Sequence, residues 1–172
     1  MKKSSRGFSL IELLIVVAII LIIAAIAIPN LLRSRIAANQ ASAVGSLRTL
    51  NTAEVTYATT YNTGYSSALG ALGPPAAGTN PVATAAGLVD EVVSGMNTSG
   101  GSSATQSSKS GYTFTYSPGV TDLTGRYNTY QIYAAPISPG TTGTNFYFTD
   151  QSGVIRQNST ALAQSSDSPL AG

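Results

Sequence analysis

The feature that most constrains this chain is a run of sixteen apolar residues, Leu13 to Ile28, that no polar side chain interrupts. Going back to Phe8 lengthens the segment, and of the added residues only Ser9 and Glu12 are polar. A helix of about 21 residues, rising about 1.5 Å per residue, spans about 32 Å, which is the thickness of the hydrocarbon layer of a bilayer. The sequence therefore predicts a helix that is long enough to enter a membrane.

A short basic leader, residues 1–7, precedes the apolar run. Its cations are Lys2, Lys3 and Arg6, and it ends in a Gly7-Phe8 junction at the apolar boundary. Because positive charges before an apolar span keep that end of the chain in the cytoplasm, the three cations predict the orientation of the helix.

The segment G-F-S-L-I-E-L, from Gly7 to Leu13, resembles the signature of type IV prepilins. The resemblance implies that a prepilin peptidase and methyltransferase cuts after Gly7 and methylates Phe8. It implies that Glu12 acts in filament assembly. The implied partners are further copies in a helical homo-oligomer, an inner-membrane assembly platform and separate ATPases.

The family match is strong over about residues 1–60 and is a likeness of layout beyond them. It implies a subunit that sits in the inner membrane with a single span and then becomes part of an extracellular pilus. Adhesion, twitching motility or DNA uptake are roles that the family implies. The main alternative is a type II secretion pseudopilin, which shares the N-terminal chemistry but forms a short periplasmic filament. A membrane-anchored binding module that never polymerises is a further alternative.

An ordinary secretory signal would also place a basic leader before an apolar run, with Ala25 and Ala27 as its cleavage site. Three features oppose that interpretation. The run is longer than a usual signal core, Glu12 interrupts its start, and Pro29 follows the would-be cut closely.

Glu12 requires a physical explanation, because a carboxylate at bilayer depth costs about 2–3 kcal/mol unless it is paired. After cleavage, the α-amine of Phe8 lies one helical turn away. That amine has two available partners, its own Glu12 or the Glu12 of a neighbouring subunit. In the second case Glu12 sets the register of an incoming subunit, a role that is better attested for buried ion pairs than net stabilisation. The residues leave both pairings open, and the resemblance favours the second.

Pro29 ends the apolar run, and an interior proline removes a helical hydrogen bond, so we expect a kink near Ile26 to Pro29. The helical pattern then continues, giving one helix from Phe8 to about Tyr61 whose second half is amphipathic. The apolar face of that half is Leu32, Ile36, Ala43, Leu47, Leu50, Ala53, Tyr57 and Tyr61, and the opposite face is Arg33, Arg35, Asn39, Ser42, Arg48, Asn51 and Thr52.

Beyond the helix, we expect a connection rich in Gly, Ser and Ala, with a short helix within residues 85–96 and a low-complexity loop over residues 97–110. From Gly111 the apolar residues alternate, which predicts four antiparallel strands joined by sequential hairpins. The predicted fold is α+β, with a long helix packed on a roughly four-stranded antiparallel sheet. The predicted segments are 1–7 (leader), 8–29 (membrane or filament-core helix), 30–61 (amphipathic half), 62–110 (connection), 111–158 (sheet) and 159–172 (tail).

The composition of the chain argues against catalytic activity and zinc binding. The chain has no His and no Cys, so the commonest catalytic bases, nucleophiles and zinc ligands are absent. We expect no enzyme activity, no cofactor and no metal. Three of the nine basic side chains lie in the leader, so six basic residues stand against seven acidic ones elsewhere, and no basic domain argues for nucleic-acid binding.

Overall fold

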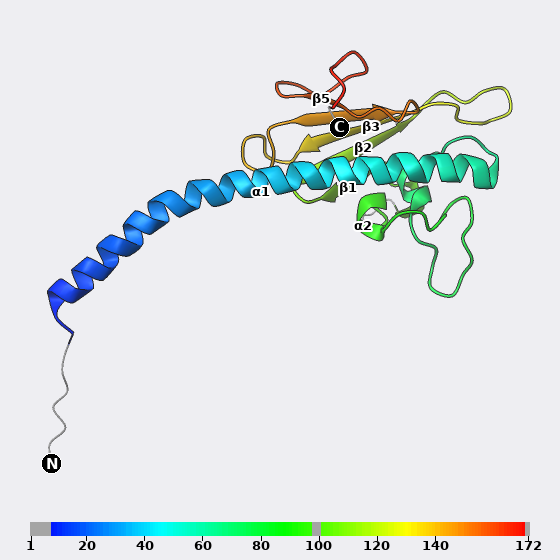
Figure 1. Cartoon of the computed structure of the whole chain (residues 1–172). Coiled ribbons are helices and arrows are strands. Elements are labelled where there is room, and N and C mark those ends of the chain that lie inside the picture. The colour runs from blue at the N-terminus through cyan, green and yellow to red at the C-terminus, as the bar shows by residue number, and fades with distance from the viewer. Residues whose placement is uncertain (1–7, 98–100, 171–172) are drawn as a thin grey trace. The chain divides into compact units, whose positions relative to one another are not determined.

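The computed structural model describes residues 8–97 and 101–170. The chain divides between Arg35 and Ile36 into two compact units. The first consists of the N-terminal part of a helix, and the second, called the head here, holds the rest of that helix and a sheet (Figure 1). The predicted α+β architecture, with a long apolar helix and an antiparallel sheet, is confirmed.

Helix α1 runs over Leu10–Tyr61 and contains Pro29. It ends where Asn62 adopts a left-handed conformation, with φ 52°, and Gly64 follows with φ 80°. A residue in this conformation just past a helix is a common way to stop it. The second half of α1 is therefore helical, as its apolar spacing predicts, and the helix ends at Tyr61.

The sheet is an antiparallel meander in which each strand pairs with the next one in sequence. The strands are β1 (Gln106–Lys109), β2 (Tyr112–Pro118), β3 (Tyr130–Pro136), β4 (Phe146–Asp150) and β5 (Arg156–Asn158).

The count of four strands was wrong, because β1 lies inside the segment predicted as a low-complexity loop. Ser110 and Gly111 both have positive φ, 50° and 74°, and they form a two-residue connection between Lys109 and Tyr112. Such a turn suits the twist of paired strands. It folds the polar segment Gln106–Lys109 back along β2, and Ser107 becomes buried.

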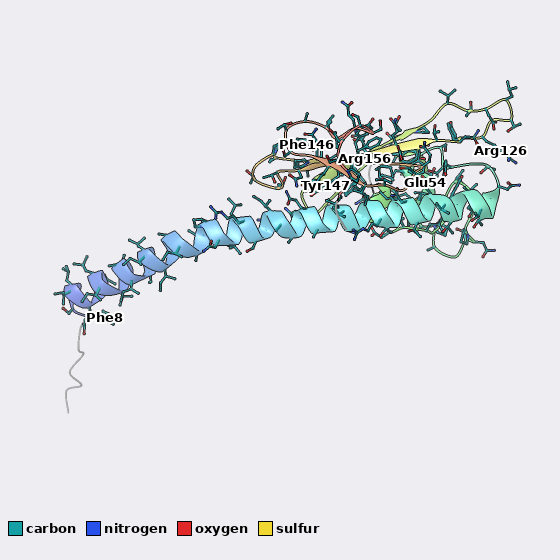
Figure 2. All side chains as sticks on the ribbon, turned by 45° about the horizontal axis from the view of Figure 1, so that its top comes forward. Phe8, Glu54, Arg126, Phe146, Tyr147 and Arg156 are labelled. Atoms are coloured by element: carbon teal, nitrogen blue, oxygen red, sulfur yellow. The ribbon has the colours of Figure 1, made fainter. Side chains whose placement is uncertain are left out.

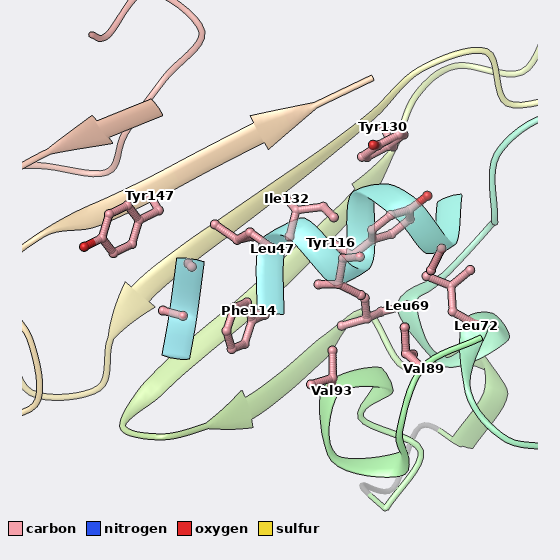
Figure 3. Packing of buried hydrophobic residues seen from close by; sticks show 14 of the residues in the cluster. Leu47, Leu69, Leu72, Val89, Val93, Phe114, Tyr116, Tyr130, Ile132 and Tyr147 are labelled. Carbon is pink, nitrogen blue, oxygen red and sulfur yellow. The ribbon is translucent and has the colours of Figure 1, made fainter. Parts of the chain in front are cut away.

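Apolar side chains of α1 and one face of the sheet form the core of the head. Figure 3 shows Leu47 of α1 among Phe114 of β2 and Ile132 of β3, and all three are fully buried. The buried face of α1 begins at Ala43. Leu32, which was predicted to share it, is 44% exposed, so that part of the prediction was wrong.

In the described part of the connection between α1 and β1 there are three short helices. They are η1 (Leu69–Leu72), α2 (Glu91–Ser94) and η2 (Gly101–Ser103). Helix α2 is shorter than the helix expected within residues 85–96. Asp90 caps its start by accepting a hydrogen bond from the Val93 amide at 2.8 Å, and Gly95 ends it in a left-handed conformation.

The C-terminal segment lies against the sheet. The Gln157 amide donates to the Ser168 carbonyl at 3.1 Å, and the Leu170 amide donates to the Ile155 carbonyl at 2.8 Å. Ala163 is fully buried. These contacts cover the outer edge of β5, and they hold the end of the head in a chain that has no cysteine.

Candidate functional site

The candidate site is the N-terminal part of α1, whose surface is apolar on every side. From Phe8 to Ile28 every side chain is exposed except that of Ala24, which is half-buried. Phe8 is 81% exposed and Ile26 is 65% exposed. By length and composition, α1 contains a segment that could cross a membrane. A helix that is hydrophobic all round needs either lipid or other protein to cover it.

Glu12 is the acidic side chain of this surface, and it lies in the first turn of α1. Its Oε2 accepts a hydrogen bond at 2.9 Å from the backbone amide of Ser9, the residue just before the helix. A Ser before a helix and a Glu at its third position are the pattern of a capping box, in which the glutamate satisfies a free amide. Within the described residues, Oε1 accepts no hydrogen bond, so one carboxylate oxygen is left for another partner.

The other predicted site residues lie on either side of Glu12. Phe8, the predicted methylation site, stands at the start of the described chain (Figure 2). Gly7 and the leader cations Lys2, Lys3 and Arg6 lie outside the described residues. Pro29 lies inside α1. Because proline has no amide hydrogen, the carbonyl four residues earlier loses its helical partner, and the kink there stays a prediction.

Sequence reasoning missed a set of polar contacts on α1. Asn51 was placed on the outward face, but its Nδ2 donates to Thr149 Oγ1 at 2.8 Å and its Oδ1 accepts from the Tyr130 hydroxyl at 3.0 Å. Asn39 likewise donates to the Thr142 carbonyl at 2.8 Å. Assigning faces by polarity alone was wrong here, because polar side chains at the border of the apolar face reach loops and strand ends of the sheet.

Glu54 was also missed. It lies on α1 (Figure 2) and is fully buried in the head. Ser66 and Tyr116 both interact with its carboxyl group. Desolvation by burial raises the pKa of Glu54, and the hydrogen bonds from Ser66 only partly oppose that shift. Glu54 stands between Ala53 and Tyr57, two apolar residues that already account for the buried face, so the sequence offers no separate signal for its burial.

Within residues 8–97 and 101–170, no three His, Cys, Asp or Glu side chains come together as a metal site would require. Asp150, which precedes the β4–β5 connection, accepts from the amide and hydroxyl of Ser152, as a turn residue does.

Comparison with known proteins gives matches at the N-terminus. The family model described as prokaryotic N-terminal methylation motif matches residues 2–28. The type IV major pilin protein PilA of Myxococcus xanthus is 51% identical over 53 residues, which are 31% of this chain and 24% of that protein. The type IV wide pilus major component PilA4 of Thermus thermophilus is 62% identical over 37 residues, 22% of this chain and 28% of that protein.

The matched region spans about a quarter of the length of these relatives. No solved structure matches the chain significantly. The methylation motif covers the candidate site, from the leader through Glu12 to Ile28. In its N-terminal part the chain is therefore similar to type IV pilins, and the apolar helix and the α+β head agree with that similarity.

Proposed function

We propose that the chain is a structural subunit of a type IV pilus filament. The observation that carries the proposal is the apolar surface of residues 8–28, which no other part of the described chain covers. In the proposal, the chain is cut after Gly7, is methylated at Phe8, and polymerises through this surface. Its role is structural rather than catalytic, in keeping with the names of its two relatives as pilus components.

Two environments would cover this helix in turn. Before assembly the segment crosses the inner membrane once, with its leader in the cytoplasm, where lipid covers it. In the filament the helices of neighbouring subunits cover one another. Between helices in lipid, packing and polar pairing drive association, because lipid is as apolar as the side chains. Outside the bilayer the hydrophobic effect holds the bundle together.

The contact between subunits is heterologous, since one surface of a subunit meets a different surface of the next. A head-to-tail contact that does not close into a ring produces an open helical polymer. Glu12 gives that polymer its register. One of its oxygens caps the helix through Ser9, and the other is available to the α-amine of Phe8 in a neighbouring subunit. Methylation leaves that amine cationic, so the pair would bury no net charge.

The substitution Glu12→Ala tests this role in cells that normally make the protein. We expect the variant to enter the membrane and to be processed, because the apolar run is unchanged, while surface filaments fall to a small fraction of the wild-type amount. The matched control is Glu91→Ala, which removes an exposed carboxylate from the head. Filaments should be sheared from the surface and quantified beside the membrane fraction.

The outcomes separate the alternatives. Normal filament yield from Glu12→Ala would reject the register role of Glu12. If the wild-type chain forms no surface filaments at native expression but is processed at Phe8, the periplasmic pseudopilus is supported instead. Adhesion, motility and DNA uptake are proposals that depend on the family, and each requires its own assay in a strain that lacks the subunit.

A further inference from the structure

The buried carboxyl group of Glu54 lies where the end of α1 meets the segment that follows it. Glu54 has no exposed surface, and neither does Ser66, its partner from that segment. Ser66 precedes η1, whose residues are all buried. The contact between Glu54 and Ser66 therefore fixes the path by which the chain leaves α1 and reaches η1.

No cation balances Glu54 among the described residues. The titratable groups that face it are the hydroxyls of Tyr57 on α1, Tyr116 on β2 and Tyr130 on β3. Burial raises the pKa of all three tyrosines, so they stay neutral over the ordinary pH range. The ion pair within the described residues joins Lys109 to Asp90 instead. An ionised carboxylate without a counter-ion is costly in such a place.

The hydrogen bonds around Ser66 indicate where the protons are. The Ser66 amide donates to Glu54 Oε2 at 2.9 Å, and the Tyr116 hydroxyl donates to the Ser66 carbonyl at 2.7 Å. The Ser66 hydroxyl lies 2.6 Å from Glu54 Oε1 and 3.0 Å from the Ala68 carbonyl. Its third neighbour, the Tyr116 hydroxyl, is farther away at 3.2 Å.

Ser66 has one hydroxyl proton for these contacts. The Ala68 carbonyl can only accept, so that contact is a hydrogen bond only when Ser66 donates to it. The 2.6 Å contact to Glu54 then needs a proton on Oε1. A neutral acid at Glu54 satisfies both contacts, whereas a carboxylate competes with Ala68 for the single proton of Ser66.

We propose that Glu54 is a neutral carboxylic acid at neutral pH, that it donates its proton to Ser66 Oγ, and that losing this proton in alkali weakens the attachment of the Ser66–Ala68 segment to α1. The relay runs from Glu54 to Ser66 and from Ser66 to the Ala68 carbonyl. The device is a pH-sensitive latch inside the head, and it does not depend on whether the chain forms filaments.

The latch predicts a definite sign for the pH dependence of folding. For an acid whose pKa is higher in the folded state, stability is full below the unfolded-state pKa and is lost as pH rises through the folded-state pKa. Between those two values the folded chain holds one proton more than the unfolded chain. The unfolding equilibrium constant of the head then rises by up to about tenfold per pH unit.

Carbon-13 NMR of the glutamate side-chain carboxyl carbons tests the proposal directly in the full chain in detergent micelles. The chain contains three glutamates, Glu12, Glu54 and Glu91, so three signals are expected. Glu54→Gln should delete the signal that has the protonated shift at pH 7. Glu91→Gln, the matched control at an exposed position, should delete a signal that is already ionised. Should Glu54→Gln not fold, Glu12→Gln and Glu91→Gln assign the remaining signal by elimination.

A urea titration at several pH values provides the second readout. The wild-type head should lose stability between mildly acid and alkaline pH, and Glu54→Gln should remove that slope, because the amide can donate to Ser66 Oγ and accept from its backbone without ionising. An ionised Glu54 signal at pH 7 would overturn the proposal. If the free energy of unfolding of Glu54→Gln depends on pH as strongly as that of the wild type, the proposed latch would be overturned.

Discussion

The packing of α1 on the sheet predicts a large effect from Leu47→Ala. Leu47 is fully buried against core residues of both layers (Figure 3). The change removes three carbon atoms, worth about 2–2.5 kcal/mol at about 0.8 kcal/mol each. The cavity that remains adds to this, and buried Leu→Ala changes cost about 2–5 kcal/mol in all. Because Leu and Ala have similar helix propensities, the loss reports packing, and we expect about 3 kcal/mol.

That loss corresponds to more than a hundredfold in the unfolding equilibrium constant of the head, at about 1.4 kcal/mol per factor of ten. The chain has nine tyrosines and no tryptophan, so urea unfolding is followed by near-ultraviolet circular dichroism of the tyrosines. Val55→Ala is the matched control, since Val55 is on the same helix but 56% exposed. A Leu47→Ala loss below about 1 kcal/mol, or one equal to that of Val55→Ala, would refute the packing described here.

Three further changes probe the head by the same denaturation assay. Asp90→Ala removes the cap of α2 and should cost about 1 kcal/mol, with Asp90→Asn costing less because Asn also caps; equal losses would contradict the capping role. Gly143→Ala places a Cβ against the buried ring of Tyr112 and should cost about 1–3 kcal/mol, and a neutral result would show that the ring moves freely. Deleting residues 159–172 removes four hydrogen bonds between residues 167–170 and residues 155–158 and should cost about 2–4 kcal/mol, whereas unchanged stability would mean that the tail is dispensable.

The sequence predicts those parts of the fold that its apolar spacing determines. An apolar run as long as Leu13 to Ile28 is compatible with few structures. The spacing of Leu47, Leu50 and Tyr57, all of them buried, matches one face of a helix. Alternation in Tyr112, Phe114 and Tyr116 places those rings on the core side of β2, as observed. Each of these patterns predicts which positions are buried, because the hydrophobic effect favours apolar side chains at buried positions.

Strand β1 could not be predicted in this way. Its segment, Gln106–Lys109, has no apolar residue, and it becomes a strand because the turn at Ser110 and Gly111 places its backbone beside β2. The available signal was the Ser-Gly dipeptide before an alternating run, which favours a tight hairpin.

The contacts of Glu12 and Glu54 differ in the same way, because the first is local in the sequence and the second is long-range. Local spacing connects Ser9 to Glu12 across one helical turn, and the structure has that contact. Glu54 meets Ser66 and Tyr116 only after the head has folded, since Tyr116 lies 50 positions beyond Ser66 in the chain. A long-range polar contact of this kind leaves no periodic pattern to detect.

The proposal that this chain is a processed filament subunit can be tested with the N-terminal peptide and intact mass of the protein in filaments sheared from its native cells. We expect a chain that begins at methylated Phe8 and is abundant in the sheared fraction. A chain that keeps Met1, or one that begins near Ile28 after signal cleavage, would contradict it.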